Sequence, residues 1–353
     1  MDVKSIQEKI KPVANAILTK AIQARLDDLT KPQGSLGRLE EFVMQYCLCR
    51  GDAGANINKM DLFTFAADHG ITNEAVAPFP REVTRQMVLN MCSGGAAVSV
   101  LCKNAGINYH VVDMGVDADF DVHPQLIQSK VSRGTVSFRN NSAMTASQCY
   151  QALETGIKLA SSSDCDLAGI GEMGIGNSSP ASALYSLLLD IDPDMTVGAG
   201  TGASGKLLEN KKKVIRESVQ YHKERWDRSA IDALTRVGGL EIAGMTGFCL
   251  GSALKRVPVA VDGFIASAAA LVAIKMVPAI GDYLFFAHSS AESFHHGFLT
   301  MMGIRPVLSL DMRLGEGTGS ALAMQIIRQA LNCYHQMATF SSAGVSKGSG
   351  VEK

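Results

Sequence analysis

One carboxylate lies between two glycines, at the point where a loop gives way to the last long helix-like segment of the chain. The residues are Gly315-Glu316-Gly317. The glycines leave the Glu316 carboxylate sterically open, and apolar neighbours such as Leu314 that cover it would raise its pKa toward the range of a general base. The alternative is a first-turn glutamate that only stabilises the helix dipole. We take Glu316 as the candidate catalytic base.

Glycine and polar residues follow the apolar runs of the sequence at several points. Glycines let backbone N–H groups approach a phosphate, and a helix N-terminus adds a favourable dipole. The pattern predicts a site for a phosphorylated nucleotide; tight turns needed only for chain reversal are the alternative. Asp68-His69 is either an acid–base pair or a capping aspartate beside a turn histidine. The segments are residues 68–70, 169–177, 198–202, 288–292 and 313–319.

Gly169, Gly171 and Gly174 have the spacing of a dinucleotide-binding fingerprint, with Asp192 near the position of a ribose-binding acid. An NAD-dependent oxidoreductase is therefore an alternative function. Two observations weaken it: the preceding strand is the third rather than the first, and Glu172 inside the loop would repel a pyrophosphate. A carboxylate at that position suits a ribose hydroxyl better.

Six short apolar runs, each ending at a turn or polar cluster, have the pattern of buried parallel strands. Segments with helical periodicity lie between most of them, which predicts an α/β fold: a Rossmann-like, doubly wound parallel sheet of about six strands. Ligands in such sheets bind outside the carboxyl ends of the strands. We expect strands at 61–67, 108–114, 166–171, 257–262, 283–287 and 306–310, and helices at 83–104, 145–161, 179–189, 205–223, 240–255 and 266–275.

The two ends of the chain lack strand-like runs. Residues 1–45 are amphipathic and helical in pattern, with a break near Pro32, and 320–337 is another long helical segment. We expect 1–45 and 320–340 to form a small helical domain beside a large α/β nucleotide-binding domain at 46–319. The Ser-, Gly- and Lys-rich end, 341–353, is expected to be a flexible tail.

The composition limits the classes of partner. The 353 residues have a formal net charge of -1, without the basic excess of a protein that binds nucleic acid or a membrane surface. The N-terminal segment lacks the apolar run of a signal peptide and no window has the length of a membrane span, so we expect a cytoplasmic protein. The scattered cysteines and histidines lack metal-ligand spacing, which predicts reduced thiols, no metal site and no cofactor.

The same segments resemble, in order, the nicotinate-nucleotide–dimethylbenzimidazole phosphoribosyltransferases of cobamide (vitamin B12) assembly. The resemblance runs from about residue 10 to 340, which is nearly the whole chain. Among its longer motifs are LTKPQGSLGRLE, GEMGIGN and LGEGTG. The motifs lie at residues 29–40, 67–70, 80–87, 94–97, 112–116, 171–177, 200–202, 238–244, 261–265, 290–292 and 314–319.

The resemblance implies a Rossmann-type sheet with a small helical domain from both chain ends. It also implies transfer of the phosphoribosyl group of nicotinate mononucleotide to an aromatic lower-ligand base, giving an α-ribotide and nicotinate. The family's general base falls on Glu316. Which of Lys211, Lys212 and Lys213 contacts phosphate is left open. The nucleotide-binding positions fall on Glu172, Gly174, Thr201, Gly202, Lys211, Asp262 and Ser290, and the acceptor-base pocket falls on Pro78, Phe79, Gln86, Met173 and Leu314.

One segment departs from the family pattern. Typical members have Ser-Ala-Tyr-Pro before a Val-Thr motif, whereas this chain has Ala77-Pro78-Phe79-Pro80. The loss of two hydroxyl groups makes the acceptor pocket more apolar, and such pockets discriminate small apolar differences weakly. We therefore expect a phenol or a broadened set of aromatic bases to be accepted, rather than only dimethylbenzimidazole.

The resemblance also implies a homodimer, with a heterodimer of two paralogues as the alternative. A catalytically silent paralogue, which binds nucleotide or supports an active partner subunit, is a further interpretation. The intact Glu316 argues against it.

Overall fold

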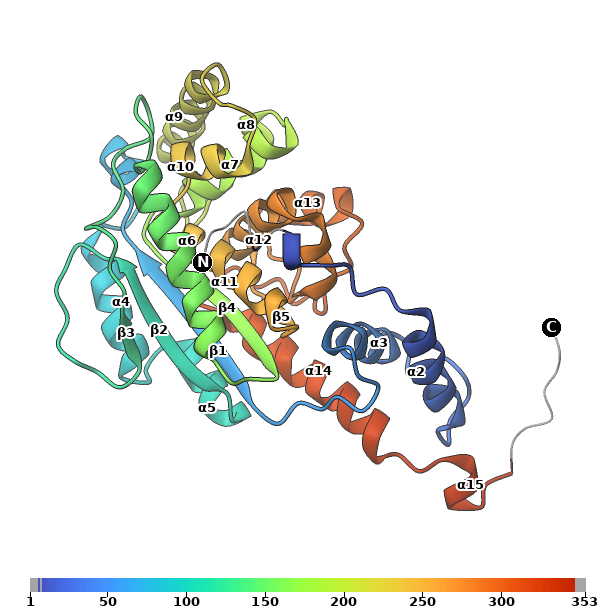
Figure 1. Ribbon diagram of the computed structural model, residues 1–353. Coiled ribbons are helices and arrows are strands. Elements are labelled where there is room, and N and C mark those ends of the chain that lie inside the picture. The colour runs from blue at the N-terminus through green and yellow to red at the C-terminus, as the bar shows by residue number, and fades with distance from the viewer. Residues whose placement is uncertain (1–5, 7, 347–353) are drawn as a thin grey trace.

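The computed structural model describes residues 6 and 8–346, and its centre is a six-stranded parallel sheet with the order β3-β2-β1-β4-β5-β6 (Figure 1). The fold class predicted from the sequence is confirmed. The chain leaves β1 toward one edge of the sheet and returns to β4 on its other side, so the strand order reverses between β1 and β4. Ligands of such sheets bind in the crevice at this point. The strands are β1 Met60–Ala67, β2 Asn108–Gly115, β3 Leu126–Gln128, β4 Leu167–Met173, β5 Val259–Val261 and β6 Leu284–Phe286.

Helices cover both faces of the sheet because its central strand is apolar on both faces. Along β1, Leu62 and Ala66 join one core cluster, whereas Phe63 and Phe65 join the other. The alternation follows from the two-residue period of a strand. One face is covered by α4 (Glu82–Cys92), α5 (Ala97–Ala105) and α14 (Thr318–Gln336), and the other by α6 (Ala146–Ser162), α11 (Leu240–Leu254) and α12 (Phe264–Met276).

The α6 and α11 helices touch backbone to backbone. A Cβ atom added to Gly156 of α6 would lie 1.9 Å from the Gly244 carbonyl oxygen, and one added to Gly247 of α11 would lie 2.0 Å from the Leu153 carbonyl oxygen. No side chain fits at either position, so glycine sets the distance between the two helices.

Two predicted elements were wrong, and one strand was missed. Segment 306–310 is not a strand: it runs beside the end of β6 but forms a single bridge, between Leu308 and His288. Pro306 has no N–H to donate, and Leu310 is more than half exposed, so the segment is a partial edge. The predicted helix 83–104 is broken into α4 and α5, with Gly94 in a left-handed conformation between them. The missed strand is β3, whose three residues carry no periodic signal.

The first helices lie beside the C-terminal end of α14 (Figure 1). They are α2 (Ala16–Asp28) and α3 (Arg38–Arg50), and Arg25 of α2 donates hydrogen bonds to the carbonyls of Tyr334 and His335, each at 3.0 Å. The division into two domains stays a prediction. The short helix α15 (Phe340–Ala343) includes the first three residues of the predicted flexible tail, and residues 347–353 lie outside the described residues.

Further helices complete the fold. No helix among the described residues is long and apolar enough to cross a membrane. The remaining elements are η1 Gly70–Glu74, α7 Ser178–Leu189, α8 Pro193–Thr196, α9 Gly205–Lys223, α10 Ala230–Val237, η2 Pro278–Tyr283 and α13 His295–Met301.

Candidate active site

The loop that bears Glu316 crosses the carboxyl end of β4 in an unusual conformation. Gly315, Glu316 and Gly317 have φ angles of 83°, 64° and 101°, so three consecutive residues are left-handed. For glutamate this conformation is strained, and such strain persists only where surrounding contacts impose it. Two contacts do so: the Thr64 hydroxyl donates to the Glu316 carbonyl at 2.6 Å, and the Glu316 N–H donates to the Glu172 carbonyl at 3.2 Å.

Asp262, directly after β5, fixes the other end of this loop. Its Oδ2 accepts from the Gly317 N–H at 2.9 Å, and its Oδ1 accepts from the N–H groups of Gly319 at 2.7 Å and Ser320 at 3.3 Å. Burial raises the pKa of Asp262 to about 7, against the lowering effect of these bonds. The carboxylate therefore caps the N-terminus of α14. These hydrogen bonds do not involve a nucleotide, so the predicted contact of Asp262 with nucleotide stays a prediction.

The environment of the Glu316 side chain suits a general base. It is 5% exposed, and its Oε2 atom has no hydrogen-bond partner among the described residues. Burial raises the pKa of Glu316 above its ordinary value, and the Asp262 charge adds to the increase. A hydrogen bond from the Val98 backbone N–H opposes this increase. A buried carboxylate with a raised pKa and one unpaired oxygen is suited to accept a proton. Leu314 is 57% exposed, so it lies at the rim rather than over the carboxylate.

Glu172 is a second buried carboxylate beside the same loop. It lies at the end of β4, in register with Phe65 of β1, and is 6% exposed. The Asn177 side-chain amide donates to it, and burial raises its pKa to about 8. A Cβ atom on Gly315 would lie 2.4 Å from Glu172 Oε1, so the carboxylate packs directly on the Gly315 backbone. The carboxylates of Glu172 and Asp262 thus both contact the backbone of residues 315–317.

A cleft at the carboxyl ends of β4, β5 and β6 brings several predicted residues together. Four of the five loop segments singled out in the sequence contribute to its wall: 169–177, 198–202, 288–292 and 313–319. Segment 68–70, which follows β1, does not. Other lining residues include Asn177, Gly200, Gly263, His288 and Glu292. Gly202, Lys211, Asp262 and the proposed base Glu316 do not line the cleft. The predicted site residues in its wall are Glu172, Met173, Gly174, Thr201, Ser290 and Leu314.

Lys211 lies under the 198–202 loop. It is 1% exposed, and its Nζ atom donates to Ser178 Oγ at 2.9 Å and to the Gly198 carbonyl at 3.0 Å. Burial lowers the pKa of Lys211 to about 8. Lys212 is half-buried, and Lys213 is exposed, with its Nζ 3.9 Å from Glu217. Of the three consecutive lysines, Lys211 is the one directed toward the nucleotide loops.

The loop that bears Ser290 is held by His295, a residue that the sequence analysis did not assign. The Ser290 N–H donates to His295 Nδ1 at 2.8 Å, so Nε2 carries the ring hydrogen and donates to Ser267 Oγ at 3.0 Å. Burial lowers the pKa of His295 to about 3, which keeps the ring neutral. Thr64 was also missed, although a lone hydroxyl inside an apolar strand was a usable signal.

The five predicted acceptor residues do not form one pocket in this structure. Met173 and Leu314 line the cleft described above, whereas Phe79 lines a groove with Asp68, Arg81 and Asp117. Pro78 and Gln86 line neither. The two hollows adjoin, since a Cβ atom on Gly176 of the cleft would lie 2.7 Å from Thr72 Cγ2, which lines the groove.

Asp68 and His69 have separate partners. Asp68 Oδ2 accepts from the Asp117 N–H at 2.7 Å, and His69 Nε2 lies 2.8 Å from Glu241 Oε1 with both side chains buried. A Cβ atom on Gly174 would lie 3.1 Å from His69 Nε2, so this pair lies beneath the start of the nucleotide loop. The His69–Glu241 pair therefore packs against the start of the nucleotide loop, whereas Asp68 lines the groove that bears Phe79.

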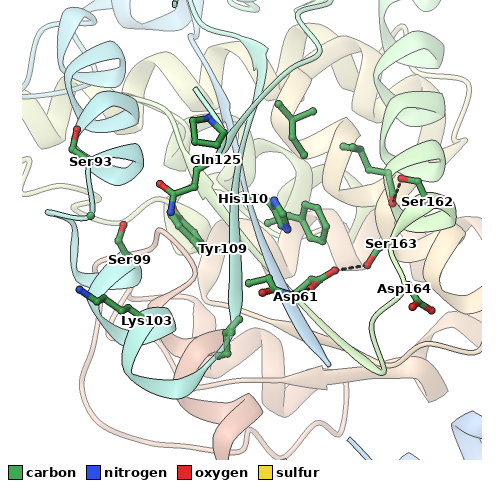
Figure 2. Close-up of a pocket in the computed structure, with 17 residues that line it drawn as sticks. Asp61, Ser93, Ser99, Lys103, Tyr109, His110, Gln125, Ser162, Ser163 and Asp164 are labelled. Atoms are coloured by element: carbon green, nitrogen blue, oxygen red, sulfur yellow. Dashed lines mark hydrogen bonds between the residues drawn. The ribbon is translucent and has the colours of Figure 1, made fainter. Parts of the chain in front are cut away.

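A larger cavity lies elsewhere, along the amino-terminal halves of β1 and β2 (Figure 2). It has a volume of about 820 Å³, and Figure 2 shows Asp61 bonded to Ser163 on one side of β2 and Tyr109 on the other. No predicted site residue lines it. Since parallel sheets bind ligands at their carboxyl ends, this cavity is not the candidate site.

The glycines of the dinucleotide-like fingerprint have structural roles. Gly169 and Gly171 lie inside β4 rather than in a loop. A Cβ atom on Gly169 would lie 2.7 Å from Met324 Sδ, and one on Gly171 would lie 2.2 Å from the Gly317 nitrogen. The missing side chains leave room for α14 and for the loop that bears Glu316, rather than for a pyrophosphate. The oxidoreductase alternative therefore has no support.

The site and fold match a known class of enzyme. The family model described as "Phosphoribosyltransferase" matches residues 10–345, so the chain belongs to this phosphoribosyltransferase family. It is 49% identical over 337 residues to the nicotinate-nucleotide–dimethylbenzimidazole phosphoribosyltransferase of Chlorobium chlorochromatii (strain CaD3), with 95% of each chain covered. The identity to the protein of the same name from Chlorobaculum parvum (strain DSM 263 / NCIMB 8327) is 48%, with 96% of each covered.

A solved structure gives the same result in three dimensions. The crystal structure of CobT from Thermus thermophilus matches with a TM-score of 0.89 and 38% sequence identity. The match covers 94% of this chain and 100% of that one. The family resemblance inferred from the sequence motifs is confirmed.

Proposed function

We propose that this chain transfers the phosphoribosyl group of nicotinate mononucleotide to an aromatic lower-ligand base of a cobamide, giving an α-ribotide and nicotinate. The names of relatives 46–49% identical over nearly the full chain support this reaction. One structural observation carries the chemistry. The unpartnered Oε2 of Glu316 is buried, the Glu316 backbone is bonded to the Glu172 carbonyl, and the preceding residues 313–315 line the cleft where the nucleotide loops meet.

Glu316 acts as the general base. The N-glycosidic bond of the donor breaks, and its electron pair goes to the pyridinium nitrogen, which leaves as neutral pyridine nitrogen of nicotinate. A lone pair of the acceptor forms the new bond to C1′, and Glu316 takes the proton from its N–H or O–H group. Attack on the face opposite nicotinate inverts the β-glycoside to the α-ribotide. The leaving group is already cationic, so its departure needs no acid.

Glu172 acts on the donor side. Positive charge develops on the ribose as the glycosidic bond lengthens, and a nearby carboxylate stabilises it. In the free enzyme the pKa of about 8 keeps much of Glu172 protonated at neutral pH. The positively charged pyridinium–ribose part of the donor favours the ionised form, so we infer that binding expels this proton.

The phosphate lies against the glycine loops in this proposal. Gly174, Thr201, Gly202 and Ser290 supply backbone and hydroxyl donors, and Lys211 supplies the positive charge. The support is that Lys211 Nζ already contacts the 198–202 loop through Gly198. Fixing the phosphate fixes C1′ for in-line attack.

The acceptor set is broader than dimethylbenzimidazole in this proposal. The acceptor would lie among Pro78, Phe79, Gln86, Met173 and Leu314 once the two adjoining hollows are joined around it, and the exposed apolar side chains of Phe79 and Leu314 support an apolar site. A phenol would be deprotonated by Glu316 as an azole is. Competition between phenol and dimethylbenzimidazole tests this, and a preference for benzimidazoles by orders of magnitude would contradict it.

We also propose that the active form is a homodimer. The exposed apolar side chains Phe79 and Leu314 beside the cleft support an arrangement in which a second copy covers them. Sedimentation of the purified chain tests the assembly. A monomer that becomes active only with a paralogue would favour the heterodimer.

The reaction is tested by incubating the purified chain with nicotinate mononucleotide, dimethylbenzimidazole and phenol, and resolving the products by mass. The proposal expects a ribotide of at least one acceptor, with an equal amount of nicotinate, and neither product with Glu316→Ala. Nicotinate released without any ribotide would indicate hydrolysis and would refute the transfer.

A further inference from the structure

Two consecutive residues of helix α9 contact two different loops, the proposed donor loop at 198–202 and the start of the proposed acceptor loop at 74–75. Lys211 holds the 198–202 loop on the donor side, as described above. Asn210 is directed elsewhere: its Nδ2 donates to the Glu74 carbonyl at 2.8 Å and to the Ala75 carbonyl at 2.9 Å. Because both partners are carbonyls, the nitrogen of the carboxamide must face them. Both of its amide hydrogens are therefore used on one short stretch of backbone.

That stretch, residues 74–76, is the start of the loop that bears Phe79, and we call it the root of the loop. Ala75 is left-handed, with φ of 51°, a conformation that is unfavourable for a residue other than glycine. In this conformation the carbonyls of Glu74 and Ala75 both reach the same amide group. Val76, which follows, is buried in the core, so the chain is fixed from 74 to 76 before it becomes exposed.

Beyond the root the loop is stiff. Pro78 and Pro80 fix their own φ angles, and each restricts the residue before it to extended conformations. Four consecutive residues, 77–80, thus have little freedom of their own. A displacement of the root is transmitted to Phe79 instead of being absorbed.

A second connection between α9 and the root is weaker. The Glu74 carboxylate accepts from Arg139 at 2.9 Å, and Arg139 also donates to Glu217 of α9 at 2.7 Å. Arg139 and Glu217 are well exposed, at 36% and 43%, so solvent screens this pair. Asn210 is the direct connection.

We propose that Asn210 is a positioning residue that sets the acceptor loop relative to the donor loops, and so contributes to the choice and orientation of the aromatic base. This rests on the proposed transfer reaction. Asn210 itself touches neither substrate. In-line attack requires the two substrates at a defined separation, and a 1 Å error in placement costs about 100-fold in rate.

The experiment compares Asn210→Ala and Asn210→Asp with wild type, and uses Glu209→Ala as the matched control. Asn210→Asp keeps the size of the side chain but cannot donate, and Glu209 is an exposed neighbour on the same helix. We expect both Asn210 variants to raise KM for the base by about tenfold, to change the ratio of kcat/KM for dimethylbenzimidazole and phenol, and to leave KM for nicotinate mononucleotide within about twofold of wild type.

Amide hydrogen exchange supplies a readout that does not need activity. Exchange should accelerate at 74–82 in both Asn210 variants and stay unchanged at 198–202, with the thermal midpoint measured alongside. Equal increases in both KM values, or unchanged exchange at 74–82, would overturn the inference. A wild-type chain that makes no ribotide would instead overturn the proposed function, while the exchange comparison would still decide whether Asn210 holds the loop.

Discussion

Asp262 holds the backbone of the loop that bears Glu316: its Oδ2 accepts from the Gly317 N–H at 2.9 Å, one residue beyond the proposed base. Its Oδ1 accepts from the Gly319 N–H at 2.7 Å, in the first turn of α14. A buried carboxylate next to β5 thereby joins the sheet, the helix and the strained loop. The resemblance to the family implies a nucleotide contact for Asp262, and this geometry indicates a positioning role.

The substitution Asp262→Asn distinguishes these two roles. Asparagine has one acceptor oxygen, so an amide group would face an N–H of Gly317 or Gly319, and the loop would lose its fixed position. We expect kcat to fall by about 10- to 100-fold with KM for nicotinate mononucleotide within about threefold. Steady-state kinetics measures both. Asp192→Asn, which alters another helix-capping aspartate at α8, is the control. A large rise in KM with kcat preserved would support direct nucleotide binding.

The raised pKa of Glu316 predicts the acid limb of the pH profile. The base must be ionised to accept a proton, so kcat/KM for the acceptor falls as pH drops through the pKa of Glu316. That pKa lies above the ordinary value of about 4.3. Dimethylbenzimidazole and phenol ionise differently, and a limb that belongs to Glu316 should be the same with both. In Glu316→Gln, kcat/KM for the acceptor should fall by about 10²- to 10⁴-fold, and the acid limb of the profile should disappear. A limb that changes with the acceptor would belong to the substrate.

The raised pKa of Glu172 predicts how donor binding depends on pH. A protonated carboxyl must lose its proton to form an ionic contact with the positively charged pyridinium–ribose part of the donor, so affinity for nicotinate mononucleotide should increase as pH rises to about 8 and then level off. Titration calorimetry in two buffers of different ionisation enthalpy measures the proton released. The phosphate also ionises in this range, so Glu172→Gln is the comparison: it keeps the phosphate contribution and should lose the rest. Identical pH dependence in both proteins would exclude Glu172.

Gly315→Ala tests the contact between the loop and Glu172. The new methyl group would lie 2.4 Å from Glu172 Oε1, in addition to the strain of a left-handed alanine at about 1–2 kcal/mol. Gly303→Ala has the same kind of strain, with φ of 66°, and no neighbour within 4 Å. We expect similar losses of stability from strain in chemical unfolding, but a large loss of activity only for Gly315→Ala. Full activity of that variant would show that the packing of Glu172 on residue 315 is dispensable.

The close contact of α6 and α11 predicts a large effect on stability. A methyl group at Gly156 would lie 1.9 Å from the Gly244 carbonyl, so the helices must separate. We expect Gly156→Ala to lower the free energy of unfolding by about 3 kcal/mol or more, as overpacking of a core does. Urea unfolding measures it. Gly281→Ala, where nothing lies within 4 Å, is the control and should change stability by less than about 1 kcal/mol.

The sequence predicted those parts of the fold that have a local signal. The strands β1 and β4 are long apolar runs, and α9 begins and ends at the predicted residues because its periodicity is regular. The strand β3 was missed because its three residues are held by pairing with β2, which no local pattern reveals.

The candidate site was predictable in outline only. The glycine spacing pointed to Glu316 as a candidate base and to the loops as a candidate nucleotide site, and both roles stay predictions. The supports were not predictable: Thr64 reaches Glu316 across 252 positions of sequence, and Asn210 reaches Glu74 across 136. Such contacts depend on which strands and helices become neighbours. The capping contacts of Asp262 were missed for the same reason, because the N–H groups that its carboxylate accepts from lie 55 and 57 residues away.

The last long helix has a consequence for how the protein is made. α14 contributes Met324, Ile327 and Leu331 to the core on one face of the sheet, and the loop before it supplies Glu316. On the ribosome, β1 and β4 emerge long before this helix. The nascent chain therefore exposes apolar strand surface until translation is nearly complete, and a prematurely terminated product would be both inactive and prone to aggregate.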